Sequence, residues 1–181
     1  LNQLAPKPLA REVLLDLAVK LGSDCALFLH AATGVMRGRG ERVERLAEPA
    51  CARLRGRRVL IFKPGFGIAT AWAYGRMAAG APASYLPAAE AEARLARWTA
   101  SDEPAETLLY NNMERPAFAK YIALPAMLAH RRKEFGLAVA MSGSGSACFA
   151  LLREKTPADA VIASVRAGWG AHSFILDTEI V

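Results

Sequence analysis

The first third of the chain combines one helical hydrophobic pattern with several short apolar runs. Apolar residues recur at helical spacing over residues 9–21 and Gly22 follows directly, so this segment is predicted to be a helix that ends at the glycine. The apolar run 25–29 is predicted to be a strand. Two further short strands are expected on either side of a glycine-containing turn, at residues 33–38 and 42–46.

Downstream of residue 58, short apolar runs alternate with amphipathic segments. The predicted strands are 59–62, 137–141, 147–152 and 174–181. The predicted helices are 70–79, 87–99, 114–134 with interruptions at Pro116 and Pro125, and 157–168 with Thr156 as its cap. Strands of antiparallel character mixed with helices predict an α+β fold.

An arginine-rich break separates these two parts of the chain. It is the densest basic run of the sequence and contains Arg53, Arg55, Arg57 and Arg58. We place a boundary there, which gives predicted domains at 1–55 and 56–181. We favour a solvated loop for this run over a nucleic-acid-binding patch. The net charge of +6 also suits a protein whose ligands are polyphosphates.

Composition indicates an ordinary globular protein with a sizeable core. Of 181 residues, 53% are hydrophobic and 22% charged. Neither a membrane-spanning run nor a signal peptide is recognisable, so a cytoplasmic location is expected. The residues that follow Leu1 read like the end of a helix already under way, so we expect sequence upstream in a longer protein. Scattered histidines and three distant cysteines predict no metal site and buried free thiols, at Cys25, Cys51 and Cys148.

The segment Met141–Ala147 is the first candidate for chemistry. It contains Ser142, Gly143, Ser144, Gly145 and Ser146. Two glycines one residue apart let the backbone turn with its amides exposed, and exposed amides beside small serines can hold a phosphate. The segment lacks the lysine of a Walker A loop and the third glycine of a dinucleotide fingerprint. A plain tight turn between two strands remains the alternative.

Asp24 is the second candidate. It lies between the exit of a predicted helix and the predicted strand 25–29, so its backbone is expected to be held while its side chain faces a cleft. A partly desolvated aspartate can accept a proton from an attacking hydroxyl. The alternative is a structural aspartate in a turn.

The segment Pro64–Tyr74 is the third candidate. A sharp turn leads into a helix start, where free amides and Thr70 can bind a polar group. Tyr74 lies four residues later on the same helical face and can stack on a nucleobase. Trp72 is interpreted as a core residue, and for Tyr74 both core and ligand roles stay open.

Taken together and in order, five segments resemble one kinase family. They are Leu21–Asp24, Gly38–Glu41, Pro64–Tyr74, Asn112–Glu114 and Met141–Ala147. Their sequence resembles the diphosphocytidyl-methylerythritol kinases of the GHMP superfamily from about Leu1 to Ile180. The last segment alone resembles only the superfamily motif, whereas the ordered set resembles this family.

The resemblance implies a fold, a reaction and roles for the candidate residues. It implies a GHMP-kinase-like α+β fold, in which part of an N-terminal lobe precedes a C-terminal α/β sandwich with an antiparallel sheet. It implies phosphoryl transfer from ATP with Mg²⁺ to a hydroxyl of a cytidine diphosphate derivative in isoprenoid precursor synthesis. Asp24 would be catalytic, Thr70 and Tyr74 would bind substrate, and Ser142 to Ser146 would shape the phosphate site. No nucleic acid or membrane partner is implied, and a homodimer is left open.

Several departures from the family pattern limit these roles. Ala26 stands where the family usually has proline, and the expected Asn-Asp pair falls on Asn111-Asn112 or Asn112-Met113, so we assign that pair no catalytic role. The family's lysine-bearing segment and its ATP-gripping glycine loop would both lie upstream of Leu1. We therefore expect this chain alone to be inactive.

Two other classes of function compete with this interpretation. The first is another GHMP kinase, of the mevalonate or homoserine kinase type, which would not bind a cytidine nucleotide through Tyr74. The second is a non-catalytic basic module for nucleotides or RNA, whose affinity would fall steeply with salt.

Overall fold

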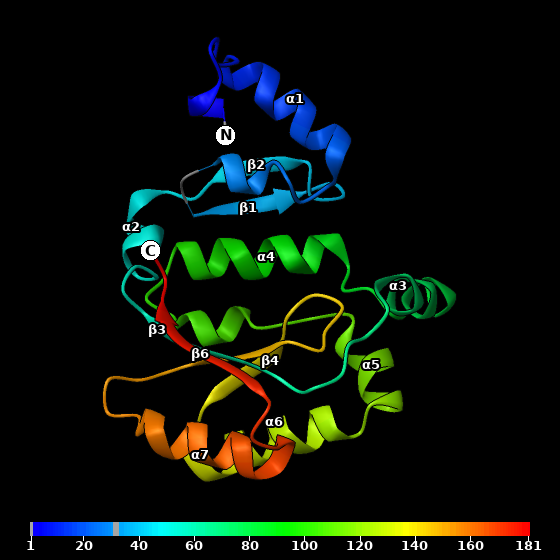
Figure 1. Ribbon diagram of the computed structural model, residues 1–181, viewed down its shortest axis with the longest axis vertical. Coiled ribbons are helices and arrows are strands. Elements are labelled where there is room, and N and C mark those ends of the chain that lie inside the picture. Colours follow the sequence, from blue (N-terminus) through cyan, green and yellow to red (C-terminus); the bar gives the residue numbers. More distant parts are fainter. Residues whose placement is uncertain (1, 31–32) are drawn as a thin grey trace. The chain divides into compact units, whose positions relative to one another are not determined.

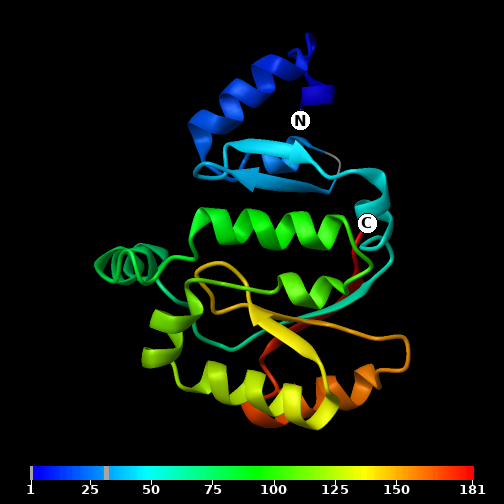
Figure 2. The same cartoon turned by 180° about the vertical axis from the view of Figure 1, so that it is seen from behind.

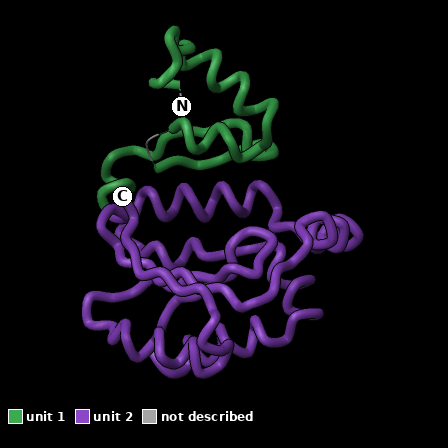
Figure 3. The backbone as a smooth tube through the Cα atoms, viewed as in Figure 1, with its two compact units in different colours: residues 1–52 green, residues 53–181 purple. Residues whose placement is uncertain are grey.

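The chain forms two compact units. The computed structural model describes residues 2–30 and 33–181 (Figure 1). The units are Leu1–Ala52 and Arg53–Val181 (Figure 3), so the division falls three residues before the 55/56 boundary placed from the sequence. The assignment of the first unit to the N-terminal lobe of a kinase stays a prediction.

The first unit contains a helix, a two-stranded sheet and short helical turns. Its elements are η1 (Asn2–Leu4), α1 (Arg11–Leu21), η2 (Leu27–Leu29), β1 (Gly34–Arg37), β2 (Arg42–Arg45) and α2 (Glu48–Ala52). Strands β1 and β2 pair antiparallel, with Gly34 opposite Arg45, which confirms the predicted hairpin. Helix α2 was not predicted.

The strand predicted at 25–29 is wrong. The backbone turns after α1 and enters the 3-10 helix η2, because Cys25 N–H bonds the carbonyl of Gly22 at 3.1 Å and Leu27 N–H bonds that of Asp24 at 3.2 Å. An apolar run of five residues fits a buried strand or a helical turn equally well by periodicity. Here local hydrogen bonds satisfy the backbone without a partner strand.

The second unit is built on a four-stranded antiparallel sheet. Its strands are β3 (Arg58–Lys63), β4 (Ala138–Met141), β5 (Cys148–Leu151) and β6 (Phe174–Glu179), in the order β4-β5-β3-β6. Strand β3 is central, pairing with β5 and β6, and its Leu60 and Phe62 are fully buried. All four predicted strands of this part are confirmed, with ends one or two residues shorter or longer.

Helices cover both faces of this sheet. The helices of the second unit are α3 (Thr70–Ala79), α4 (Ala88–Thr99), η3 (Ala105–Leu108), α5 (Glu114–Lys120), α6 (Ala123–Phe135) and α7 (Ala158–Trp169). Figure 1 and Figure 2 show α6 and α7 together on one face, with α4 and η3 on the other. The α+β fold predicted from the sequence is therefore confirmed. No helix in the described part of the chain is long and apolar enough to cross a membrane.

Two prolines and one threonine show how the helices of the second unit begin. Pro116 and Pro125 both lie in the first turn, of α5 and α6, where no intrahelical bond needs their missing N–H. The predicted interruption is thus a break between two helices. Thr156 was predicted to cap α7, but that prediction is wrong, because its hydroxyl accepts a hydrogen bond from the Arg153 N–H at 2.9 Å and Pro157 occupies the cap position.

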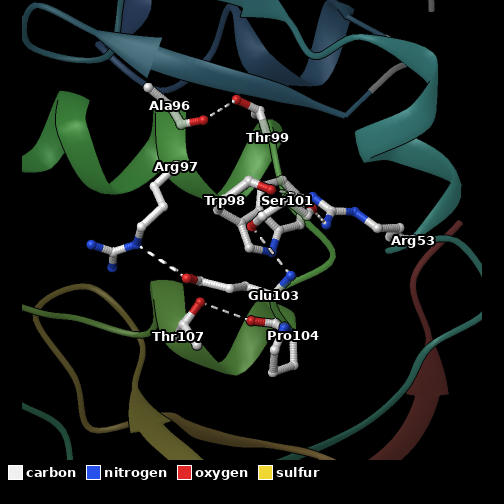
Figure 4. A network of polar contacts seen from close by, with 9 residues as sticks. All are labelled: Arg53, Ala96, Arg97, Trp98, Thr99, Ser101, Glu103, Pro104 and Thr107. Atoms are coloured by element: carbon white, nitrogen blue, oxygen red, sulfur yellow. Dashed lines mark hydrogen bonds and ion pairs between the residues drawn. The ribbon is translucent and has the colours of Figure 1, made fainter.

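The arginine run is mostly engaged rather than solvated. Arg53 stacks its guanidinium 4.1 Å from the centre of the Trp98 ring and donates hydrogen bonds to the carbonyls of Trp98 and Ser101 (Figure 4). The neighbouring arginines form two ion pairs, Arg57 with Glu106 at 2.7 Å and Arg58 with Asp177 at 2.5 Å. The predicted solvated loop is therefore wrong for Arg53 and Arg57, which are partly buried, whereas Arg58 stays exposed as expected.

Candidate active site

The glycine-serine segment forms a tight connection between β4 and β5. The N–H of Ser142 bonds the carbonyl of Ala147 at 2.8 Å, and the N–H of Gly145 bonds that of Ser142 at 2.9 Å. Gly143 and Gly145 both have positive φ, 52° and 81°, which glycine adopts at little cost. A Cβ on Gly145 would lie 2.6 Å from the Met141 sulfur, whereas one on Gly143 would meet nothing within 4 Å. The connection therefore depends on glycine at 145 for space as well as conformation.

Two polar side chains from outside the loop hold its first residues. Asn111 donates through Nδ2 to the carbonyls of Met141 at 2.8 Å and Gly143 at 2.9 Å, and the Glu114 carboxylate accepts from the Met141 N–H at 2.8 Å. Asn112 has a different task, since its side-chain oxygen accepts from the N–H of Leu86 at 2.9 Å. Sequence reasoning gave Asn111 no role. The sequence signal that could have identified Asn111 is the polar pair that it forms with Asn112 between two predicted helical segments.

The serines of the loop have different roles. The Ser146 hydroxyl is buried and donates to the carbonyl of Phe66, so it anchors the loop, and its predicted part in shaping a phosphate site stays a prediction. The Ser144 hydroxyl lies 3.1 Å from that of Thr70, the first residue of α3. Ser142 is exposed. The structure thus brings together the glycine loop and the predicted Thr70 segment, which are 74 residues apart in sequence.

The start of α3 adds free amide groups beside this loop. No side chain caps the helix, and the cap residue Ala69 accepts from the N–H of Ala73. The first N–H groups of such a helix have no intrahelical acceptor and favour an anion. The N–H groups of Gly143 and Ser144 likewise have no acceptor among the described residues. The loop and the helix start together suit a phosphate group.

The two aromatic residues of α3, Trp72 and Tyr74, differ in their burial, which bears on whether each is a core residue or can stack on a ligand. Trp72 packs against the core, edge-on to Tyr121 at 5.7 Å, and Lys120 Nζ lies 4.5 Å from its ring centre. Tyr74 is 54% exposed, one turn after Thr70. The core interpretation of Trp72 is confirmed. Tyr74 is available to stack on a ligand, and that role stays a prediction.

Asp24 belongs to the first unit, where its carboxylate lies against the β1–β2 turn. A Cβ on Gly40, whose φ is 113°, would lie 2.7 Å from Asp24 Oδ1, so only glycine fits there. In the same turn, the backbone N–H groups of Glu41 itself and of Arg39 lower the pKa of the Glu41 carboxyl. Asp24 is exposed. That Asp24 and the glycine loop meet on one ligand stays a prediction, because they lie in different units.

Cys148, directly after the loop, is a buried structural thiol. Burial, and secondarily the Glu114 carboxylate, raises its pKa to about 12. All three cysteines are free, although Cys25 is only partly buried. Among the described residues, no three His, Cys, Asp or Glu side chains cluster to hold a metal ion.

A family model matches the part of the second unit that contains the glycine loop and the two residues that clamp it, Asn111 and Glu114. Residues 103–171 match the family described as "GHMP kinases C terminal". The second unit carries a GHMP kinase C-terminal domain. The matched range includes Asn111, Glu114 and the whole loop from Ser142 to Ser146, so these residues form part of the GHMP domain.

Curated relatives extend the similarity over nearly the whole chain. The 4-diphosphocytidyl-2-C-methyl-D-erythritol kinase of Nitratidesulfovibrio vulgaris (strain DP4) is 31% identical over 92% of this chain and 56% of its own length. The enzyme of the same name from Methylacidiphilum infernorum is 33% identical over 87% of this chain and 50% of its own length. The resemblance predicted from the sequence is confirmed, while the chain spans only about half the length of these relatives.

Solved structures agree with both units. A solved 4-(cytidine 5'-diphospho)-2C-methyl-D-erythritol kinase matches 99% of this chain and 61% of its own chain, with 30% identity and a TM-score of 0.70. A homoserine kinase from Cytophaga hutchinsonii matches with a TM-score of 0.68 but only 17% identity, and that likeness concerns the fold alone. The GHMP fold is therefore shared between kinases of different names, and fold alone does not select the substrate.

Proposed function

We propose that this chain is part of an ATP-dependent kinase that phosphorylates a hydroxyl of 4-diphosphocytidyl-2-C-methyl-D-erythritol. The observation that carries this proposal is the contact between Thr70 and Ser144, at 3.1 Å. It joins two amide-rich anion sites, the α3 start and the glycine loop, into one candidate phosphate site. The identity of the substrate in this proposal is taken from the names of the similar kinases described above.

Each candidate residue has a distinct task in this proposal. The N–H groups of Gly143 and Ser144 hold a phosphate, and the Asn111 and Glu114 clamp keeps the loop rigid before the ligand arrives. Tyr74 stacks on the cytosine ring. Asp24 accepts or orients the proton of the attacking hydroxyl. Mg²⁺, when bound with ATP, neutralises charge on the phosphates.

Kinase assays on the longer protein test the catalytic part of the proposal. Asp24→Asn keeps the shape of the side chain but removes its basicity, so kcat is expected to fall at least about a hundredfold. Asp16→Asn, an exposed carboxylate on α1 of the same unit, is the matched control and should leave kcat unchanged. Near-normal turnover of Asp24→Asn, with intact folding by circular dichroism, would remove Asp24 from the mechanism. The 181-residue chain by itself is expected to be inactive.

Nucleotide binding tests the cytidine part without any turnover. CDP is titrated into the longer protein, and Tyr74→Ala is expected to weaken binding about fivefold to a hundredfold because stacking contributes about 1–3 kcal/mol. Tyr85→Ala removes another exposed tyrosine and serves as the control. In the same titration, Asn111→Ala should weaken binding by loosening the loop, whereas Asn112→Ala should not. Equal CDP affinity in the Tyr74 and Tyr85 variants contradicts the cytidine assignment.

A homoserine-kinase-like activity is the second candidate, because the shared fold does not by itself select the substrate. Phosphorylation of homoserine rather than the cytidine substrate by the longer protein would select it. A non-catalytic RNA module would instead show generic RNA binding that falls steeply with salt and no phosphoryl transfer.

A further inference from the structure

The sheet of the second unit has two edge strands, β4 and β6, which differ in how their outer backbone groups are bonded (Figure 1). The outer N–H and C=O groups of an edge strand can pair with a further strand. On β4, side chains already bond such groups. Arg132 donates to the Val139 carbonyl at 2.8 Å, while Asn111 and Glu114 bond the carbonyl and the N–H of Met141, both at 2.8 Å. These three side chains close the β4 edge to another strand.

Strand β6 presents bare backbone groups along its outer edge. The N–H of Ile180 donates to the Arg57 carbonyl at 2.9 Å, so the even-numbered residues of β6 face β3. The N–H and C=O groups of Ile175, Asp177 and Glu179 therefore point away from the sheet. Within the described part of the chain, neither a strand nor a side chain bonds these outer groups. The open edge of the sheet is thus β6.

The same strand exposes two large apolar side chains. Ile175 packs against the core on the face of Phe62, whose ring contacts Trp169 at the end of α7. Successive side chains of a strand point to opposite faces, so Phe174 and Leu176 lie on the other face. They are 55% and 45% exposed. A strand that combines bare backbone groups with exposed apolar side chains is suited to pair with another strand.

We propose that β6 binds a second copy of this chain, so that the two β6 strands pair antiparallel about a two-fold axis and the two sheets become continuous. A two-fold contact uses the same surface on both copies, so that surface must be complementary to itself. The pattern of apolar and charged residues along β6 meets this requirement in one register, as shown below. The contact does not depend on the proposed kinase activity.

The favoured register has Leu176 at the two-fold axis and pairs residues 174–178 of each strand. The two Leu176 side chains then face each other, and Phe174 of each copy lies opposite Thr178 of the other. Ile175 lies opposite Asp177 of the other copy, and these two residues exchange hydrogen bonds through their outward N–H and C=O groups. Both the bare backbone groups and the exposed apolar side chains are covered in this register.

Other registers are less favourable because they place like charges together or shorten the contact. An axis at Asp177 sets the two aspartates directly opposite each other, and an axis at Thr178 sets Asp177 opposite Glu179. Like charges directly opposite on neighbouring strands are destabilising. An axis at Ile175 pairs only residues 174–176 of each strand. The acidic residues of β6 therefore select a copy whose strand is centred on Leu176.

Sedimentation equilibrium of the 181-residue chain in reducing buffer tests the association. One short strand from each copy makes a contact smaller than about 1,200 Å², so a weak dimer with a Kd of about 10–100 µM is expected. The average mass should rise from that of one chain toward twice that value between about 1 µM and about 1 mM. Leu176→Lys places two charges together at the axis and should weaken association at least about tenfold. Ile122→Lys, at an exposed apolar residue just before α6, is the matched control and should change nothing.

Disulfide formation between copies tests the register. A Cys25→Ser background leaves only buried native thiols. In it, Leu176→Cys is expected to crosslink on oxidation, because the two Cα atoms lie about 4.5 Å apart at the axis. Thr178→Cys is the matched control, since its two Cα atoms lie about 14 Å apart, beyond the reach of a disulfide. Electrophoresis without reductant measures both, and this pair decides the matter even if Leu176→Lys fails to fold.

Three results would overturn the proposal. The first is a chain that remains a monomer at about 1 mM, at least about tenfold above the expected Kd. The second is equal association of the Leu176→Lys and Ile122→Lys variants, which would place any contact between copies elsewhere. The third is crosslinking of Thr178→Cys as fast as that of Leu176→Cys, which would exclude a pairing centred on Leu176.

Discussion

The two units of this chain differ in what they bury. Among residues 2–30 and 33–52 of the first unit, the buried apolar residues are small, namely Ala18, Ala26, Ala50 and Cys51. Its large apolar residues are exposed instead, with Leu4 at 83%, Leu21 at 83% and Phe28 at 84%. The second unit fully buries large side chains on both faces of its sheet, among them Leu60, Phe62, Trp98, Leu124, Leu128, Val161 and Val165.

This difference identifies the second unit as the self-supporting part of the chain. Burying one Leu, Phe or Val contributes about 1.5–3 kcal/mol, so a core of such residues can offset the conformational entropy of ordering its segment. A unit of 52 residues whose described part buries only small apolar side chains cannot. The candidate phosphate site lies in the stable unit, whereas Asp24 lies in the weakly supported one.

The largest expected difference is in whether each unit folds when it is separated from the other. The segment 53–181 is expected to fold alone and unfold cooperatively, while 1–52 is expected to be unstructured in isolation. Hydrogen exchange on the whole chain should show the amides of β3 and β5 exchanging at least about a thousandfold more slowly than those of α1. Slow amide exchange throughout α1 would contradict the conclusion that the first unit is less stable than the second.

Each unit contains a thiol that reports on it. Cys25 is partly buried, whereas Cys148 is fully buried and its pKa is raised to about 12. A pKa of about 12 leaves roughly one thiol in ten thousand ionised at pH 8, and only the thiolate reacts. Iodoacetamide at pH 8 is therefore expected to label Cys25 first, by about a thousandfold in rate, as measured by peptide mass spectrometry. If iodoacetamide labels Cys148 at a rate similar to that of Cys25, the second unit does not protect its thiol better than the first.

A pair of glycine substitutions separates space from conformation in the loop of the stable unit. Gly145→Ala is expected to lower the free energy of unfolding by about 3 kcal/mol, because positive φ and a clash with Met141 add together. Gly143→Ala suffers only the conformational penalty, about 1–2 kcal/mol, since nothing lies near its Cβ position. Denaturant unfolding of the segment 53–181 measures both. Equal losses would show that the Met141 contact is relieved by repacking.

The smallest effect concerns an ion pair in the second unit. A hydrogen bond from Arg57 lowers the pKa of the Glu106 carboxyl, so the pair stabilises the fold above pH 4.5, the ordinary value, and this contribution disappears as the pH falls through the lowered pKa. Glu106→Gln is expected to remove about 1 kcal/mol at pH 7 and to flatten the loss of stability below pH 4.5. Glu103→Gln, in the more exposed pair with Arg97, is the control. If the free energy of unfolding depends on pH identically in the unmodified protein, Glu106→Gln and Glu103→Gln, the Arg57–Glu106 pair is not the source of this pH dependence.

Much of the second unit could be read from local sequence. Helix α3 has the predicted bounds 70–79, and both strands flanking the glycine loop are present. The two prolines marked the starts of α5 and α6. Such features follow from hydrophobic periodicity and from backbone restrictions of Gly and Pro, which act within a few residues. The same local signals also supported the family resemblance.

Tertiary structure decided everything that depends on a distant partner. The run 25–29 forms a turn and a 3-10 helix that are held by local hydrogen bonds. Arg53 is partly buried because it stacks on the Trp98 ring and donates hydrogen bonds to two carbonyls. Ser146 became an anchor and Asn111 a clamp because Phe66 and the loop carbonyls come close only in the folded chain. Side-chain chemistry is written in the sequence, but the partner that each polar group meets is set by packing between segments many residues apart.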